Sequence, residues 1–281
     1  MTVLGENRYG KSHVRVMKVD REGERHRVHE WNVEVWLKGD FRNCFEDGDN
    51  SRILPTDTMK NTVYYLARLT QATTIEQFAT ELVTYLLSNN PQVDEAAAGI
   101  SATPWVPLLA GGQEDGTAFM QAGTVHDTTA VSGSRGSAVK VSAGFSDLAL
   151  LKTAKSGFAG YIRDKLTTLR ETHDRLLGTL ASGEWDYTEG ADYTDARHRI
   201  TDALLNAFAV HDSLSVQQTL YAMGEAALQA EPGISQIRLS MPNKHCNLVD
   251  LSAFGLENPN HIFVPTDEPH GSIEACIRRA N

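Results

Sequence analysis

Hydrophobic and polar positions alternate in the first part of the chain. Val14 and Val16 begin a β-branched stretch, and Trp31, Val33 and Val35 then alternate with polar neighbours. A period of two residues is typical of strands that bury one face of a sheet. We therefore predict an antiparallel pair of strands in this region.

Two later segments carry hydrophobic residues at spacings of three and four, which is the period of an α-helix. A short helix is predicted to follow Thr56 and Asp57, and a clearer one runs from Ile75 to Leu87. Thr73 and Glu76 have the spacing of a capping box, in which each side chain accepts a backbone N–H hydrogen bond. They predict where the second helix begins.

The middle of the chain, residues 92–136, has the weakest pattern. Two strands, around Trp105–Leu109 and Phe119–Val125, are predicted on either side of a loop from Gly111 to Gly116. Small residues at 132–137 predict a flexible joint near the centre of the sequence.

The second half shows strand-like and helix-like patterns in the same order as the first half. A strand-like stretch, Ala138–Leu151, leads through the polar segment 152–183 to helical patterns over Tyr193–Val210 and Ser215–Ala230. Apolar runs after Ile234, one of them at Leu248 to Leu251, predict the closing strands.

Strands followed by helices thus occur twice, which predicts an α+β fold with antiparallel sheets and helices on one face. We place the two halves at residues 1–136 and 137–281. No repeat of individual residues accompanies this repeat of architecture, so the division is a prediction from pattern alone.

Composition narrows the classes of function. The 281 residues include 26 Lys and Arg against 36 Asp and Glu, a net charge of −10. Nucleic-acid-binding proteins need clustered cations to displace counterions, so we expect no nucleic-acid partner. No stretch approaches the roughly 18 consecutive apolar residues of a membrane span, so we expect no membrane partner.

Three widely spaced cysteines, Cys44, Cys246 and Cys276, form neither a disulfide framework nor a paired metal motif. They favour a reducing compartment. The first residues do not have the pattern of a signal peptide, and Arg278–Asn281 does not resemble a peroxisomal address of the Ser-Lys-Leu type. We therefore expect a cytoplasmic location.

Familiar cofactor motifs do not occur in the sequence. It has no His-Glu-x-x-His motif, no Gly-x-Gly-x-x-Gly and no Walker loop. His26 and His29 are three apart on a predicted strand, which points their side chains to opposite faces. We expect no metal and no organic cofactor.

Short polar clusters remain, and each has an ordinary structural interpretation when taken alone. Thr56 could cap a helix, and Lys11 and Arg175 could be solvated charges. The order of the clusters along the chain is more specific than any single one. In sequence, they are Tyr9-Gly-Lys11, Gly39-Asp-Phe41, Thr56-Asp-Thr-Met-Lys-Asn-Thr-Val-Tyr64, Phe158 to Arg175, Ser215-Val-Gln217 and Pro242-Asn-Lys-His245.

In these strings the chain resembles the urate oxidase (uricase) family of cofactor-independent oxidases. The resemblance spans nearly the whole sequence except roughly residues 91–137. It implies tandem tunnelling-fold (T-fold) domains, whose antiparallel sheets assemble into barrels around a tunnel. It also implies a homotetramer with sites at subunit interfaces, which oxidises urate with O₂ and water to 5-hydroxyisourate and hydrogen peroxide in purine catabolism.

The resemblance further assigns roles to individual residues. Lys11, Thr56 and His245 would form a proton relay. Arg175 offers a rigid fork of donors to a planar anion, and Phe158 offers an aromatic face for stacking. The residues expected to bind substrate or O₂ are Thr56, Asp57, Phe158, Arg175, Val216, Gln217 and Asn243.

Three positions depart from residues that are common among relatives: Ala159, His173 and Cys246. None of these departures removes a residue that has an assigned chemical role.

Two other interpretations stay open at this point. A zinc-dependent ring-opening relative would need a Cys/His cluster that the chain lacks. A purine- or pterin-binding T-fold protein without oxidase activity would keep Arg175 and Gln217 but could dispense with Lys11 and His245. The joint presence of all four favours an enzyme.

Overall fold

The computed structural model describes residues 2–21 and 23–280; Met1, Glu22 and Asn281, the last residue of the C-terminal tetrapeptide considered above, lie outside the described residues. The chain forms two compact units. Unit 1 contains the residues up to Phe145 together with Asp186–Thr194, and unit 2 contains Ser146–Trp185 and the residues from Asp195 on.

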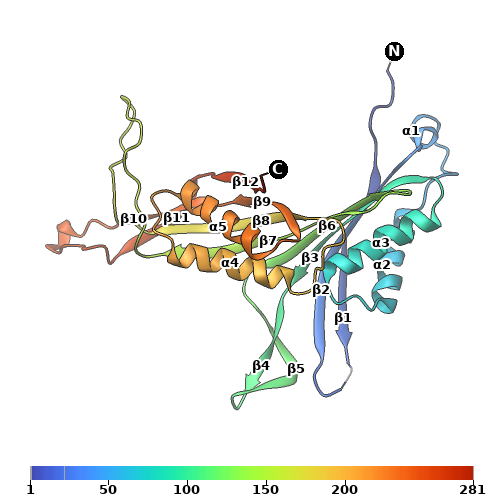
Figure 1. Ribbon diagram of the computed structural model, residues 1–281, viewed down its shortest axis with the longest axis horizontal. Coiled ribbons are helices and arrows are strands. Elements are labelled where there is room, and N and C mark those ends of the chain that lie inside the picture. Colours follow the sequence, from blue (N-terminus) through green and yellow to red (C-terminus); the bar gives the residue numbers. More distant parts are fainter. Residues whose placement is uncertain (1, 22, 281) are drawn as a thin grey trace. The chain divides into compact units, whose positions relative to one another are not determined.

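Unit 1 contains the first helices and strands of an α+β fold (Figure 1). Its elements are β1 (Tyr9–Asp20), β2 (Arg27–Gly39), α1 (Arg42–Asp47), α2 (Thr56–Leu69), α3 (Ile75–Asn89), β3 (Val93–Thr103), β4 (Trp105–Ala110), β5 (Gln113–Gln121), β6 (His126–Ser134) and the first part of β7 (Lys140–Lys152).

Unit 2 contains the rest of β7 and the later elements. These are β8 (Leu177–Tyr187, whose last two residues belong to unit 1), α4 (Ala196–Val210), α5 (Val216–Ala230), β9 (Ile234–Ser240), β10 (Asn243–Leu248), the 3₁₀ turn η1 (Ser252–Phe254), β11 (Phe263–Gly271) and β12 (Glu274–Arg278).

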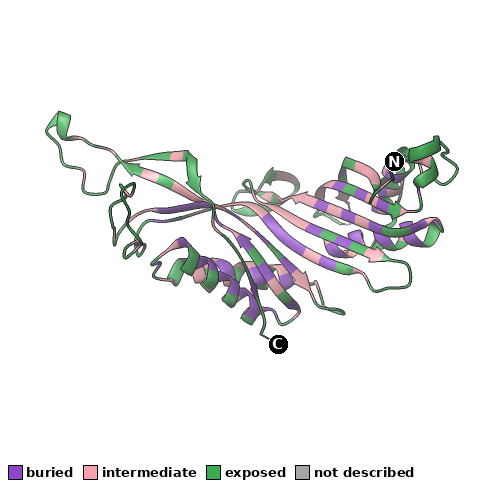
Figure 2. Cartoon of the chain, turned by 90° about the horizontal axis from the view of Figure 1, so that it is seen from above, coloured by how far each residue is buried: buried purple, intermediate pink, exposed green. Residues whose placement is uncertain are grey.

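The predicted strand pair at the start of the chain is confirmed. β1 and β2 pair antiparallel with Val14 opposite Val33 and Val16 opposite Trp31, and all four side chains are buried. Strands then follow in the order β1-β2-β3-β6-β7. Buried and exposed residues alternate along these strands in Figure 2, as expected where one face is covered.

Helices α2 and α3 cover one face of the unit 1 strands (Figure 1). Met59 and Val63 of α2 and Phe78 and Leu82 of α3 are fully buried in the same core as the strand residues. Burial of large apolar side chains stabilises this layer by roughly 1.5–3 kcal/mol for each. Both helices therefore lie where the hydrophobic spacing predicted them.

The capping box of α3 lies one residue later than predicted. The Thr74 hydroxyl, and not that of Thr73, accepts the N–H hydrogen bond of Gln77, and the Gln77 side chain takes the place expected for Glu76. Glu76 is instead buried, with 2 % of its surface exposed.

The central region is more regular than the sequence predicted. β3 pairs with both β2 and β6, although its Ala96 to Gly99 stretch has no large apolar residue to mark a strand. β4 and β5 form a separate ribbon with a short turn at Gly111-Gly112. The predicted joint at 132–137 is partly wrong, since Ser132–Ser134 lie in β6 and Arg135 donates hydrogen bonds to the carbonyls of Asn90 and Val93.

In unit 2, β8 pairs with β9 and β10, β10 pairs with β11, and β9 pairs with β12. Helices α4 and α5 lie against these strands (Figure 1), and their residues Ile200, Leu204, Leu220 and Met223 are buried. β8 begins at Leu177, within the segment that was predicted only to be polar. A strand was predicted at Leu248 to Leu251, but the observed strand, β10, lies before it and ends at Leu248.

Among residues 2–21 and 23–280, no helix combines the length and the apolar character that crossing a lipid bilayer requires.

Candidate functional site

The candidate residues divide between the two units. Unit 1 carries Lys11, Thr56 and Asp57, and unit 2 carries all the others.

In unit 1, the start of α2 presents the Asp57 carboxylate next to two donors. Lys60 donates to one carboxylate oxygen at 2.5 Å and Asn61 to the other at 3.0 Å. The hydrogen bond from Lys60 and the positive charges of Lys60 and Lys11 hold the pKa of Asp57 below its usual range. The Lys11 ammonium on β1 is thus one of the charges that act on the Asp57 carboxylate.

Thr56 is the first residue of α2, and Pro55 occupies the N-cap position without any side-chain cap. The simple interpretation of Thr56 as a helix cap is therefore wrong. Thr56 is exposed, and its hydroxyl makes no hydrogen bond to any other residue that the structure describes. A hydroxyl both donates and accepts, so Thr56 is free to exchange a proton with a bound molecule.

In unit 2, backbone hydrogen bonds hold three distant segments together. Phe158 and Thr172 exchange N–H···O bonds of 2.7 and 3.1 Å, and Arg175 donates its N–H to the Ser156 carbonyl at 2.8 Å. On the other side, Gly157 donates to the Ser213 carbonyl at 2.8 Å. Phe158, Arg175 and the start of α5 are therefore brought together by the main chain.

Arg175 and Phe158 form the centre of this group. The Arg175 guanidinium carbon lies 5.4 Å from the centre of the Phe158 ring. Burial lowers the pKa of Arg175, and its Nε is buried without a hydrogen-bond partner among the described residues. Buried donors without partners are rare in native proteins, so the unsatisfied Nε indicates a place where a ligand acceptor fits.

A second ring supports Phe158 from within the same loop. The Tyr161 and Phe158 rings stack with their centres 4.9 Å apart and an angle of 14° between their planes. The Tyr161 hydroxyl donates to the Leu169 carbonyl at 2.7 Å, which ties the two sides of the loop. Of the departures noted above, Ala159 and His173 are exposed and Cys246 is half-buried.

Val216 and Gln217 are the first residues of α5. Ser215 is the N-cap, and its hydroxyl accepts the Gln218 N–H at 3.1 Å. The N–H groups at the start of a helix have no acceptor within the helix and lie at its positive end. Val216 is buried and Gln217 is exposed, so the backbone of the first and the amide of the second are presented at this end.

Asn243 and His245 lie on β10. Asn243 is the cross-strand partner of Thr179, four residues after Arg175 on the same stretch of chain. A bulge separates Asn243 from His245, and His245 is exposed and paired with Thr266. The neighbouring Lys244 forms an ion pair with Asp267 at 2.7 Å.

Two hydroxyl groups near these residues escaped the sequence analysis. Ser156 and Thr179 are buried, and the hydroxyl of each lacks a hydrogen-bond partner within the described part of the chain. The sequence gives no sign of these buried hydroxyl groups, because serine and threonine are ordinary residues in a polar segment and in a weakly patterned strand.

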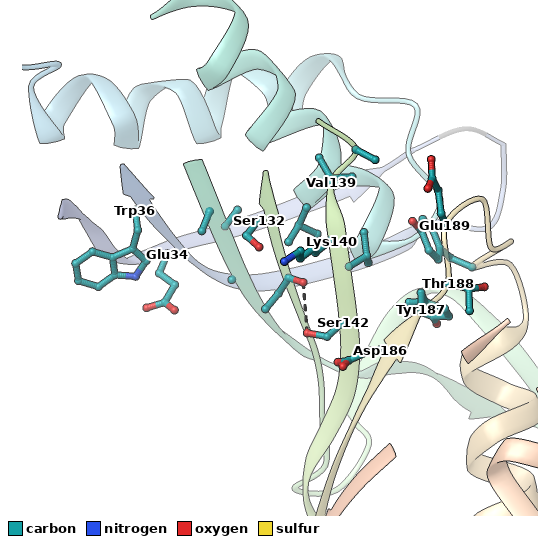
Figure 3. Close-up of a pocket in the computed structure, with 18 of the residues that line it drawn as sticks. Glu34, Trp36, Ser132, Val139, Lys140, Ser142, Asp186, Tyr187, Thr188 and Glu189 are labelled. Atoms are coloured by element: carbon teal, nitrogen blue, oxygen red, sulfur yellow. Dashed lines mark hydrogen bonds between the residues drawn. The ribbon is translucent and has the colours of Figure 1, made fainter. Parts of the chain in front are cut away.

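A pocket lies elsewhere in unit 1. It has a volume of about 970 Å³ and is lined by strands β2, β3, β6 and β7 and by the segment Asp186 to Gly190. Figure 3 shows Glu34, Trp36 and Lys140 among its lining residues. None of the candidate residues, all of which are described, lines this pocket.

Within the described residues, no group of three or more His, Cys, Asp or Glu side chains is placed to hold a metal ion. The candidate groups thus consist of a cation, hydroxyl and carboxylate set in unit 1 and of an arginine, aromatic and amide set in unit 2.

The family model for uricases matches residues 7–132 and 141–274, which include every candidate residue. The chain belongs to the uricase family. A uricase of Arthrobacter globiformis is 41% identical over 99% of this chain and 90% of its own length. A uricase of Dictyostelium discoideum is 35% identical over 100% of this chain and 99% of its own length.

Solved structures agree with this family membership. The crystal structure of the uricase from Arthrobacter globiformis superposes with a TM-score of 0.94, at 39% identity, over 99% of this chain and 96% of the other. A uricase from Bacillus fastidious, at 22% identity and a TM-score of 0.84, has the same fold. The α+β architecture with antiparallel strands is therefore that of uricases.

Proposed function

We propose that this uricase-family chain is a urate oxidase. It oxidises urate with O₂ and water to 5-hydroxyisourate and hydrogen peroxide, as a step of purine catabolism. The observation that carries the proposal is the family match, which spans both candidate groups. The unsatisfied Arg175 Nε beside an aromatic ring is what a site for a planar anion requires.

In unit 2, the proposed substrate is held at its edges and on its face. Arg175 donates from its rigid fork to a carbonyl oxygen and a ring nitrogen of urate. Gln217 pairs with the opposite polar edge, and the Val216 backbone adds a contact at the positive end of α5. Phe158 stacks on the ring, an interaction worth about 0.5–1.5 kcal/mol beyond burial of its area.

The proposed chemistry is removal of protons from urate, whose electrons then pass to O₂. Lys11 takes the proton through the Thr56 hydroxyl, and His245 passes it on. Asp57 contributes a backbone contact to the substrate, and Asn243 holds O₂ and afterwards the attacking water over the ring. Urate is itself the reductant, so we propose that the reaction uses neither a metal nor an organic cofactor.

We further propose that the two halves are tandem T-fold domains, 1–136 and 137–281, that four chains form a homotetramer, and that its sheets close into barrels around a tunnel. The site is then completed at a subunit interface, where Lys11, Thr56 and Asp57 of one subunit meet Arg175 and Phe158 of another. Closing the sheets into barrels also covers strand edges that would otherwise be open to aggregation.

The proposed location is the cytoplasm. Cys44, Cys246 and Cys276 are free thiols, which a reducing compartment preserves.

The deciding experiment follows urate absorbance in air-saturated buffer, using chelator-treated protein whose tetrameric state is verified. We expect urate to disappear with one peroxide formed for each urate consumed. Loss of urate without peroxide would contradict the proposed reaction. No loss from an intact tetramer would contradict the proposal and leave a purine-binding protein as the alternative.

The relay is tested by Lys11→Met. General acid–base groups contribute about 10²- to 10⁴-fold to a rate, so we expect kcat to fall by that order. Binding of a purine inhibitor that cannot be oxidised should change little. Full turnover by this variant would contradict the assignment of Lys11.

A further inference from the structure

Tyr9 links the two segments of unit 1 that carry the candidate catalytic residues. It lies on β1, two residues before Lys11. Its hydroxyl accepts the Leu54 N–H at 2.8 Å and donates to the Leu54 carbonyl at 3.2 Å. Leu54 stands two residues before Thr56, separated from it only by Pro55.

We propose that Tyr9 is a positioning residue for the proton relay, because its hydroxyl fixes the segment before α2 against the strand that carries Lys11. The proposal rests on the proposed urate oxidase function, in which Lys11 and Thr56 act together. Tyr9 itself acts through these residues and through the backbone of Leu54.

The double hydrogen bond is well suited to such a role. One hydroxyl satisfies both polar groups of a single peptide residue, so Leu54 cannot rotate without breaking a bond. Pro55 follows with φ −55° and is the N-cap of α2, and the proline ring keeps φ near this value. The orientation of Leu54 is thus transmitted to the first turn of α2, where Thr56 and Asp57 lie.

The ring of Tyr9 is held as firmly as its hydroxyl. It meets the Phe41 ring edge to face, with centres 4.9 Å apart, and Phe41 is 1 % exposed. Tyr9 also packs against the unit 1 core. Burial raises the pKa of Tyr9, which favours the protonated hydroxyl that both donates and accepts.

Gly10 fixes the strand that carries Tyr9 and Lys11. A Cβ at Gly10 would lie 2.0 Å from the Val35 carbonyl oxygen, so only glycine lets β1 approach β2 this closely. Side chains two residues apart on a strand share a face, which places Tyr9 and Lys11 on the same side of β1. A bulge follows directly after Lys11, where the register with β2 shifts.

The test is Tyr9→Phe, which keeps the ring and removes only the hydroxyl. Small misplacements of catalytic groups are costly, so we expect kcat for urate oxidation to fall roughly 10- to 100-fold. The acid and alkaline limbs of the pH–rate profile should also shift, since the spacing of Lys11 and Asp57 changes. Binding of a non-oxidisable purine should change much less than kcat, because Arg175, Phe158 and Gln217 keep their positions and only the contacts from the first turn of α2 are loosened.

Tyr65→Phe is the matched control, because Tyr65 is a 56 % exposed tyrosine on α2. It should leave kcat and the pH profile unchanged. A Tyr9→Phe tetramer with wild-type kcat and an unshifted profile would overturn the positioning role. If the wild-type protein does not oxidise urate at all, the proposed urate oxidase function is wrong, and this result is distinct from a failure of the Tyr9 positioning role.

A second variant applies if Tyr9→Phe does not assemble. Phe41→Leu removes the ring contact and keeps the Tyr9 hydroxyl, so the link is loosened and not cut. We expect a smaller fall in kcat with inhibitor binding retained. Unchanged kcat in Phe41→Leu, measured on an assembled tetramer, would count against the proposal.

Discussion

Arg175 combines burial, an aromatic neighbour and an unsatisfied donor. Its main chain is fixed to Ser156, so the guanidinium is presented from a defined position. The partial burial that lowers its pKa also shields its Nε from water. These properties leave the Arg175 Nε without a hydrogen-bond partner among the described residues, and they distinguish Arg175 from the exposed Arg163 and Arg170 of the same loop.

Arg175→Lys should therefore weaken urate binding strongly. Lysine keeps the charge but loses the planar fork, and a hydrogen bond to a charged group contributes about 1.5–3 kcal/mol, so we expect KM to rise roughly 10- to 100-fold. Arg170→Lys, at an exposed position of the same loop, is the control. Equal KM values for the two variants would refute the role of Arg175.

Tyr9 should make stability depend on pH at the alkaline end. Burial raises its pKa above the ordinary 10.0, so the folded state holds the phenolic proton more tightly than the unfolded state. Its contribution to stability is complete below pH 10.0 and is lost as the pH rises through the folded pKa.

The comparison is between wild type and Tyr9→Phe in denaturant unfolding at a series of pH values. The free energy of unfolding of wild type should fall towards that of Tyr9→Phe in the alkaline window. A constant difference across that window would show that Tyr9 titrates alike in both states.

At the scale of elements, hydrophobic periodicity located those that bury large side chains. The β1–β2 pair and helices α3, α4 and α5 follow from regularly spaced Val, Leu, Ile and Phe residues. β3 did not, because alanine and glycine fill its middle and tertiary pairing alone makes it a strand. The start of β8 did not either, because Leu177 and Leu180 are three residues apart and do not show the period of two of a strand. Sequence spacing carries no record of such pairing.

In the candidate site, too, some features could be predicted from the sequence and others depend on tertiary contacts. Motif order along the chain was enough to single out Phe158, Arg175 and Val216. Their proximity depends on backbone bonds between segments 155–158, 172–175 and 213, which are far apart in sequence. The Tyr9–Leu54 link is equally non-local and could not be read from the chain.

Ser215 at the start of α5 gives a prediction for this helix. Loss of an N-cap typically costs about 0.5–2 kcal/mol, so Ser215→Ala should reduce the free energy of unfolding by that amount. KM for urate should rise as well, because Val216 and Gln217 sit on the released turn. Ser215→Thr, which retains a cap hydroxyl, should keep the denaturant midpoint and the KM close to those of the wild type. A Ser215→Ala variant with unchanged midpoint and unchanged KM would contradict the capping role.

At the scale of the molecule, the division of candidate residues between units permits a complementation test. Lys11→Met and Arg175→Met tetramers should each be nearly inactive. Mixed tetramers reassembled from both should recover about a quarter of wild-type activity, because paired interfaces bring an intact Lys11 to an intact Arg175.

The activity of the mixture is compared with that of each variant taken through the same dissociation and reassembly, with subunit exchange followed by mass labelling. No recovery in proven mixed tetramers would place all of the chemistry within one chain and contradict an interfacial site.

The return of Asp186–Thr194 to unit 1 has a consequence for synthesis on the ribosome. Tyr187 and Tyr193 from this segment pack against the unit 1 core and on each other, with ring centres 4.8 Å apart. Domains generally fold as the chain emerges. Unit 1 is not complete after its first 145 residues; part of its core stays uncovered until residue 194 has left the exit tunnel, by which point Ser146–Trp185, the first segment of unit 2, has already emerged.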